Sequence, residues 1–455
     1  MIDPSWPVLV QVNAVSLVDE GPAHVFDLIQ EKVAPTGVLL AAHGFNPEVV
    51  DRGRTWPGHG PQGFNTNRGG YFATVHEEYY RHIRLGSPRV REPLFDGFDA
   101  MAVAGREAAA RNLGLHVYIL ESAGTGGFQR HVTGWTSVLE IDVDGRRGKL
   151  PCVNHPDYRA WKLALLEDLY SSYRFEGLLW GVERWGPLHQ TIANEAPACF
   201  CDHCRVVAIN AGLDWQRVKT GYAAFRDTVK ANATGQPGGS GLLRLLLTYP
   251  EILAWEARWT DAYLSLHREL YGAAKWMEPD RSFGLGLWHY YFINPLLQAE
   301  WNLAEFSARA DYIRPILYHL PEGPRIKRYL GMLSSALGGI REETVWTLIT
   351  DSLGLDLPAI EAFAGSGLPA DFVSQGIETI RRNAGAGTKI IAGLGVDVFE
   401  HGLERSMTQD DVAAAIRAAH AARADGITLS RNYAEMKHAN LTAAGDTLRA
   451  LRASR

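Results

Sequence analysis

The sequence predicts an α/β fold, a (β/α)8 barrel that occupies residues 1–455 as one domain. Short apolar runs alternate with segments of helical spacing, and eight such pairs follow one another along the chain. The apolar runs are almost uninterrupted, as expected for parallel strands covered on both faces. An open, doubly wound sheet is the alternative. It usually carries a Gly-rich dinucleotide loop after its first strand, and VNAVSLVDEGP (residues 12–22) does not match one.

The strands are rich in Val, Ile and Leu, and each is followed or preceded by a turn signal. VLVQVN is the first strand, and TGVLLAAH and LHVYILES are the next two. FEGLLWGVE is the fourth strand. In chain order, strands are expected at residues 8–13, 36–43, 115–122, 175–183, 282–289, 310–319, 388–397 and 425–432.

The segments between the strands have apolar residues at three- and four-residue spacing, which predicts helices that cover the barrel. HPDYRAWKLALLEDLYSSY leads into the fourth strand, and an Ala-rich segment leads into the third. A closing helix is expected over AGDTLRALRA at the end of the sequence. In chain order, helices are expected at residues 22–33, 98–112, 155–173, 242–277, 410–424 and 444–453.

Two connections are much longer than the others. Residues 44–94, after the second strand, are rich in Gly, Asn, His and aromatic residues, and loops of this length are usually functional or disordered. The aromatic content favours a loop that folds over the mouth of the barrel, where active sites are built. Residues 320–387, after the sixth strand, have the pattern of several helices and predict a small helical insertion.

The composition is that of an ordinary soluble globular protein, with 46% hydrophobic and 21% charged residues. A net charge of -6 and the lack of a long basic run argue against nucleic acid or an anionic membrane as partner. We see no signal-peptide pattern and no apolar run of about 18 residues that would span a membrane. We therefore expect a cytoplasmic protein, which could form a homo-oligomer.

In a (β/α)8 barrel, the residues at the carboxyl ends of the strands carry the chemistry. Three of them here are carboxylates: Glu121, Glu183 and Asp397. The others are polar or aromatic, as in clefts that bind sugars, and we expect them to contact substrate. They are Asn13, His43, Trp180, Trp185, Trp288, His289, Tyr318, His319, Arg431 and Asn432.

Paired carboxylates at a polar, aromatic mouth suit cleavage of a glycosidic bond, because one protonates the leaving oxygen and the other stabilises or attacks the sugar carbon. Glu183 is the candidate general acid/base, Asp397 the candidate nucleophile and Glu121 a supporting carboxylate. Burial beside Trp180 and Trp185 would raise the pKa of the acid. Each carboxylate also has a structural alternative. Glu183 could pair with Arg184 or Arg431 at the rim, Glu121 could form a similar ion pair, and Asp397 could cap the turn that follows it.

The chain has four cysteines, and they surround the fourth strand. Cys152 precedes the helix that leads into this strand, and Cys199, Cys201 and Cys204 follow it in the motif CFCDHC. In a reducing compartment such a cluster favours a metal site over disulfides. Four thiolates form a closed, structural site of the kind that zinc occupies, which would tie together the loops beside Glu183. Free thiols are the alternative.

One cysteine, a glutamate on the fourth strand and then Cys-x-Cys-x-x-Cys resemble the family 42 glycoside hydrolases, the zinc-containing β-galactosidases, and uncharacterised barrels related to them. The resemblance implies zinc on the four cysteines and a general acid/base at Glu183. The sequence departs from that family in two ways. Val182 precedes the glutamate where the family has Asn, and Asp397 stands where the family has a glutamate nucleophile.

We therefore predict a glycosidase that acts on a short oligosaccharide or glycoside, for instance a β-galactoside. The resemblance implies that it uses a carboxylate pair and retains the anomeric configuration. Two alternatives remain open at this point. One is a sugar isomerase, epimerase or lyase on the same barrel, in which Glu121 and Glu183 as a pair would hold a divalent metal with His289 or His319, or abstract a proton. The other is a carbohydrate-binding barrel without turnover.

Overall fold

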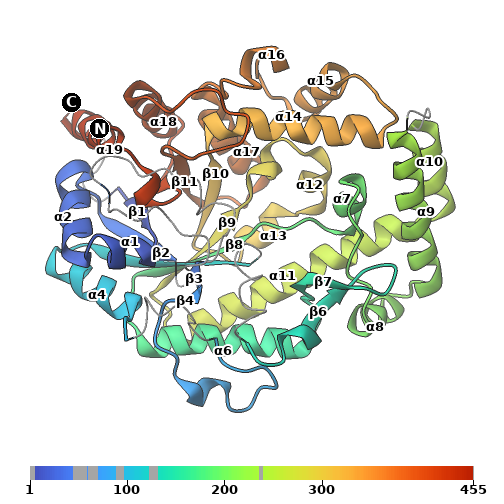
Figure 1. Ribbon diagram of the computed structural model, residues 1–455, viewed down its shortest axis with the longest axis horizontal. Coiled ribbons are helices and arrows are strands. Elements are labelled where there is room, and N and C mark those ends of the chain that lie inside the picture. The colour runs from blue at the N-terminus through green and yellow to red at the C-terminus, as the bar shows by residue number, and fades with distance from the viewer. Residues whose placement is uncertain are drawn as a thin grey trace.

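The structure is a computed structural model that describes residues 6–41, 43–44, 59, 70–88, 97–121, 132–234 and 239–453. Eight parallel strands form a closed barrel in the order β1-β12-β11-β10-β9-β8-β5-β2, which confirms the predicted fold (Figure 1). The barrel closes because β1 pairs with both β2 and β12. The barrel strands are β1 (Val8–Val12), β2 (Gly37–Ala41), β5 (Gly114–Leu120), β8 (Gly177–Val182), β9 (Ser282–Leu287), β10 (Tyr312–Leu317), β11 (Lys389–Gly395) and β12 (Gly426–Ser430).

Helices surround the barrel on its outer side, with α6, α11, α14 and α19 prominent among them (Figure 1). The α-helices in the described part are α1 (Ala14–Asp19), α2 (Pro22–Val33), α4 (Ala100–Ala110), α6 (Pro156–Ser172), α7 (Pro187–Ile192), α8 (Asp202–Asn210), α9 (Trp215–Ala233), α10 (Gly239–Thr248), α11 (Glu251–Met277), α12 (Pro295–Glu300), α13 (Leu303–Ser307), α14 (His319–Ala336), α15 (Glu342–Leu353), α16 (Ile360–Phe363), α17 (Asp371–Asn383), α18 (Gln409–Ala421) and α19 (His438–Ala453). None of these is long and apolar enough to cross a membrane.

Local sequence signals explain where several helices begin. Pro156 is the first residue of α6, and the His155 ring accepts a hydrogen bond from the Asp157 amide. At α18, Thr408 and Asp411 form a reciprocal capping box. The helix expected at 242–277 is divided into α10 and α11, because Pro250 supplies no amide hydrogen at their junction.

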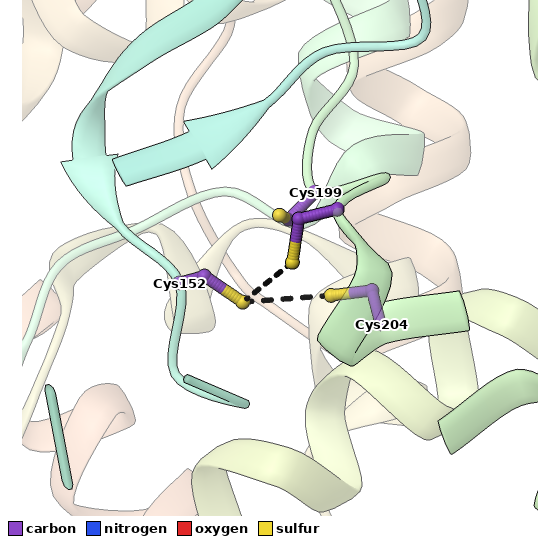
Figure 2. A group of neighbouring side chains, drawn as sticks. Cys152, Cys199 and Cys204 are labelled. Carbon is purple, nitrogen blue, oxygen red and sulfur yellow. Dashed lines mark hydrogen bonds between the residues drawn. The ribbon is translucent and has the colours of Figure 1, made fainter. Parts of the chain in front are cut away.

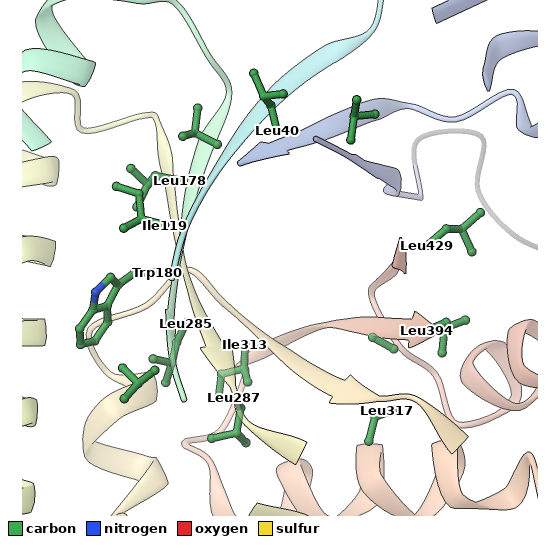
Figure 3. Close-up of a cluster of buried hydrophobic side chains, with 14 of the residues drawn as sticks. Leu40, Ile119, Leu178, Trp180, Leu285, Leu287, Ile313, Leu317, Leu394 and Leu429 are labelled. Carbon is green, nitrogen blue, oxygen red and sulfur yellow. The ribbon is translucent and has the colours of Figure 1, made fainter. Parts of the chain in front are cut away.

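Side chains on the outer faces of the strands form the main core against the helices. Leu178, Trp180 and Leu285 belong to this layer, which Figure 3 shows as it extends along the strands. Trp180 stacks on His267 of α11 with ring centroids 5.2 Å apart, which fixes this face of β8 as the helix-facing one. Alternation along the strand then directs Leu179, Gly181 and Glu183 into the barrel.

The barrel interior has its own apolar layer. It consists of Leu9, Leu39, Leu179, Tyr312 and Ile391, with Tyr118 packed against it. Glycines at the facing positions make room for large side chains. A Cβ at Gly284 would lie 2.2 Å from the Tyr312 ring, so the interior admits this tyrosine only because Gly284 has no side chain.

The remaining elements lie in the connections. A hairpin of β6 (Leu139–Ile141) and β7 (Arg147–Pro151) follows β5, and β3 (His43–Gly44) pairs with β4 (Gly70–Tyr71). The helices α14 to α17 lie in the connection between β10 and β11, and most of residues 44–94 falls outside the described part. The 3-10 helices among the described residues are η1 (Glu77–Tyr80), η3 (Trp135–Val138), η4 (His289–Phe292) and η5 (Tyr433–Glu435).

Candidate functional site

Glu183 lies at the carboxyl end of β8, one residue beyond the strand, and is partly accessible. Gly181, the preceding inward position, leaves space that Tyr118 of β5 fills. A Cβ on Gly181 would lie 3.1 Å from the Tyr118 hydroxyl. The charge of Glu183 acts on this tyrosine, because burial and then the nearby Glu183 carboxylate raise the pKa of Tyr118. Glu183 therefore belongs to the interior of the barrel, at its mouth.

Basic side chains surround this carboxylate. Burial raises the pKa of Glu183 above its usual value, while the charges of His289, Arg325, Arg314 and Arg431 act in the opposite direction. The protonated form of Glu183 therefore persists to higher pH than that of an ordinary glutamic acid.

Arg314 enters the site from the middle of β10. Its Nη2 donates to the Tyr318 hydroxyl at 3.0 Å and to the Ser430 hydroxyl, and Ser430 donates to Gln11 Oε1 at 3.1 Å. A Cβ on Gly393 would lie 2.6 Å from Arg314 Nε, so this glycine of β11 makes room for the guanidinium. The arginine is almost fully buried, and its partners here are neutral, so its charge remains available to Glu183.

A second group of ionisable side chains lies beside Arg314. His289 Nδ1 lies 2.7 Å from Glu322 Oε1, and Arg325 Nη1 lies 3.5 Å from Glu322 Oε2. Arg325 also pairs with Glu400 at 2.7 Å. These contacts orient the His289 ring and hold Arg325 between two carboxylates at the rim.

Aromatic rings form one wall of the mouth. The Trp185 ring lies 4.5 Å from both Trp288 and Tyr290, centroid to centroid, and these two lie 4.8 Å from each other. All three residues are partly accessible. On its other side Trp185 stacks on His189 at 4.8 Å with an interplanar angle of 12°. Flat, partly exposed rings beside a carboxylate can pack against the apolar face of a sugar.

Asp397 follows β11 with a left-handed backbone, φ 53°. Its side chain is 2% exposed and accepts hydrogen bonds from the Lys437 amide at 2.8 Å and from Asn440 Nδ2 at 2.9 and 3.0 Å. Burial raises the pKa of Asp397, against the effect of these hydrogen bonds. The carboxylate therefore joins the end of β11 to the start of α19.

Glu121 lies on the opposite side of the sheet from Glu183. Its carboxylate accepts hydrogen bonds from Tyr158 and, at 3.0 Å, from Trp180 Nε1, and it lies 3.1 Å from Lys162 Nζ. Because Glu121 and Trp180 both face the helices, the structure does not bring them to the mouth with Glu183. A metal site or a carboxylate pair built from Glu121 and Glu183 is therefore not assembled.

The other residues expected to contact substrate lie in different environments, some at the mouth and others in structural contacts. Asn13 caps α1 by accepting from the Val15 amide at 2.9 Å, and Arg431 pairs with Glu435 at 2.6 Å. Tyr318 is at the mouth, in a small cluster with Trp288, whereas His319 is buried as the first residue of α14. Asn432 is partly accessible after β12, and the side chain of His43 lies outside the described part.

Two important residues were missed by sequence reasoning. Arg314 interrupts the apolar strand ADYIRPILYH, and a lone arginine in an otherwise apolar run was a usable signal. Glu322 is completely buried in the first turn of α14, where nothing in its local sequence shows that it faces His289.

The four cysteines come together, as predicted, between the end of β7 and the start of α8. Figure 2 shows the sulfurs of Cys152 and Cys204 facing each other, with Cys199 beside them. Cys152 Sγ lies 3.5 Å from Cys204 Sγ and 3.6 Å from Cys201 Sγ, and all four sulfurs lie within 4.8 Å of one another. A tetrahedron of sulfurs 2.3 Å from a metal has edges of about 3.8 Å, so this group could hold a metal ion.

No family model matches the chain, and no curated protein matches it. Solved structures do resemble it. The glycoside hydrolase domain of PgaB (BpsB) from Bordetella bronchiseptica aligns over 98% of both chains, with 13% identity and a TM-score of 0.51. A β-galactosidase from Halorubrum lacusprofundi aligns over 99% of this chain and 58% of its own, with 13% identity and a TM-score of 0.54.

An α-L-fucosidase from Paenibacillus thiaminolyticus aligns over 98% of this chain and 49% of its own, with 10% identity and a TM-score of 0.54. The chain thus spans about half the length of the fucosidase and somewhat more of the galactosidase. These likenesses show that the fold is the barrel found in glycoside hydrolases. Because fold alone does not determine activity, any reaction must be argued from the site.

Proposed function

We propose that this protein hydrolyses a glycosidic bond of a short oligosaccharide or glycoside, with Glu183 as the general acid/base. The observation that carries the proposal is the position of Glu183, a partly accessible carboxyl group inside the mouth of the barrel with a raised pKa. The fold, shared with glycoside hydrolases, and the aromatic wall of Trp185, Trp288 and Tyr290 support it.

In this mechanism the protonated Glu183 donates its proton to the leaving oxygen as the bond to the sugar carbon breaks. The resulting carboxylate is then stabilised by the charges of Arg314, Arg325 and Arg431. In the second half of the reaction the same carboxylate takes a proton from the attacking water.

Asp397 remains the proposed nucleophile, since it follows the strand β11, where the resemblance places that group. To attack, its carboxylate would have to exchange the hydrogen bonds from Lys437 and Asn440 for a contact with the sugar. The same hydrogen bonds favour a second candidate function, carbohydrate binding without turnover, in which Asp397 is only a link between β11 and α19.

We also propose that the four cysteines hold zinc as a structural ion. Their sulfur-only ligand set is one that zinc prefers, and the separations of 3.5 and 3.6 Å are close to those of a tetrahedral site. The ion would keep the segment after β8, which begins with Glu183, attached to the β6–β7 hairpin.

The test is a panel of aryl glycosides and natural disaccharides assayed with the wild type, Glu183→Gln and Asp397→Asn. Loss of a general acid costs on the order of 10²–10⁴ in rate, and most for substrates with poor leaving groups. We therefore expect Glu183→Gln to impair disaccharides more than activated aryl glycosides, and Asp397→Asn to impair both. Exposed Glu305→Gln is the control.

Turnover by Glu183→Gln at the wild-type rate on every substrate would reject the assignment of the acid. Sugar binding by the wild type, together with no hydrolysis of any glycoside, would favour the binding function instead.

A further inference from the structure

A second group of metal-ligating side chains lies away from the cysteines. His189 on α7, Glu256 on α11 and Glu300 at the end of α12 place one ligand atom each within 4.8 Å of one another. His189 and Glu256 are 1% and 2% exposed, and the Glu300 side chain is 12% exposed. Three segments that are distant in the sequence thus direct one imidazole and two carboxylates to the same enclosed point.

The atoms that face this point have no hydrogen-bond partners within the described residues. They are His189 Nδ1, Glu256 Oε1 and both carboxylate oxygens of Glu300. His189 Nδ1 lies 3.7 Å from Glu300 Oε1. Buried polar atoms are normally satisfied, and two adjacent carboxylates without a cation repel each other.

The second carboxylate oxygen of Glu256 is fully engaged. Glu256 Oε2 accepts from the Leu188 amide at 2.8 Å and from the Tyr222 hydroxyl at 3.0 Å. The carboxylate passes beside Gly186, where a Cβ would lie 1.9 Å from Glu256 Oε1. The surrounding structure therefore fixes the orientation of the Glu256 carboxylate. Its Oε1 is held toward His189 and Glu300.

We propose that His189, Glu256 and Glu300 form a second metal site, which binds a divalent transition-metal cation such as Mn²⁺ or Zn²⁺. One nitrogen and carboxylate oxygens are donors that suit these ions. Ligands on opposite sides of an ion at about 2.1 Å are about 4.2 Å apart, so small rotations of the side chains close the group around the ion. The cation replaces the missing partners of all three side chains and neutralises the two carboxylates.

Binding has a consequence for Asn294, which is completely buried beside His189. Its Nδ2 lies 2.9 Å from His189 Nε2, while its Oδ1 caps α12 at the Leu297 amide, 3.1 Å away. With this orientation the ring proton of neutral His189 is on Nδ1. For Nδ1 to bind the cation, the proton moves to Nε2, and the Asn294 amide turns so that its oxygen accepts it. Metal-bound histidines commonly have such an acceptor.

The site would also support the mouth of the barrel. Trp185 stacks on His189, so an ion that fixes the imidazole fixes the back of the aromatic wall. The cation is thus a structural element behind the wall and takes no part in the proposed proton transfer at Glu183.

The experiment is a Mn²⁺ titration of the full chain, in which free Mn²⁺ is measured by electron paramagnetic resonance. Mn²⁺ is chosen because it prefers oxygen ligands, whereas the four thiolates prefer zinc. We expect one Mn²⁺ per chain in the wild type and affinity lower by more than about 100-fold in Glu300→Gln and Glu256→Gln. Glu305→Gln, a half-exposed glutamate on α13, should bind as the wild type does.

A spectroscopic measurement on the wild type covers the case in which a variant does not fold. Spin-echo modulation of the bound Mn²⁺ should show one coupled imidazole nitrogen, which His189→Asn removes. The proposal is overturned if the wild type takes up no Mn²⁺, if the bound ion shows no nitrogen coupling, or if folded Glu300→Gln retains wild-type affinity. In that event the two carboxyl groups share a proton instead.

Discussion

The Glu121 carboxylate lies 3.1 Å from the Lys162 ammonium, and their side chains are 0% and 2% exposed. The ion pair joins the end of β5 to α6 behind the barrel wall, and Tyr158 and Trp180 donate to the same carboxylate. A glutamate at the end of a barrel strand thus serves the packing of the helix layer, because its side chain faces outward.

The first prediction concerns this ion pair. Lys162→Met leaves the Glu121 charge buried without its cation, and breaking such a pair typically costs 3–5 kcal/mol of unfolding free energy. The double variant Lys162→Met, Glu121→Gln should recover a large part of that loss, because no unpaired charge remains. Urea denaturation of the two variants measures the difference. Equal stability of the single and double variants would show that the pair is not a unit.

The second prediction concerns the pH dependence of hydrolysis. Since burial raises the pKa of Glu183, its protonated form persists above the usual range of a glutamic acid, and kcat/KM should fall as pH rises through that pKa. Arg314→Met removes a charge that favours the carboxylate, so the alkaline limb should move upward by about one pH unit. Arg258→Met, on an exposed part of α11, is the control. A downward movement would contradict the assignment.

The third prediction concerns the cysteines. If they hold zinc, elemental analysis of Glu300→Gln, in which the second site is weakened, should still find one zinc per chain. A Cys201→Ser variant should lose that ion and unfold at a lower temperature, because a structural zinc contributes directly to folding. Cys201 is the most accessible of the four, so this change disturbs packing least. A metal-free wild type with unchanged stability would argue for free thiols.

The fourth prediction concerns acid stability. Burial lowers the pKa of His267 to about 4, below its value in an unfolded chain of about 6.5. The unfolded state therefore binds a proton that the folded state excludes, and stability is lost as pH falls from about 6.5 to 4, by up to about 3 kcal/mol for this residue.

His267→Phe keeps a ring against Trp180 but cannot titrate, so its stability should depend less steeply on pH over that range. Denaturation midpoints at several pH values test this. An unchanged slope would mean that His267 is protonated in the folded protein.

The sequence by itself determined the barrel and the cysteine group. Apolar runs of strand length, separated by helical periodicity, are local properties, and eight of them leave few ways to bury both faces of every strand. Cys-x-Cys-x-x-Cys likewise brings three sulfurs together within one turn and one helix start, and Cys152 is delivered by the β6–β7 hairpin.

Only the tertiary structure decided which strand-end residues share the mouth. Whether Glu121 or Glu183 faces inward depends on the alternation of each strand relative to the closed barrel, and a shift of one residue reverses it. The hydrogen bonding of the Asp397 carboxylate depends on Lys437 and Asn440, about forty residues away. The group of His189, Glu256 and Glu300 forms only because three helices meet. Such long-range contacts leave no periodic signal in the sequence, because each residue type is compatible with its own helix or turn.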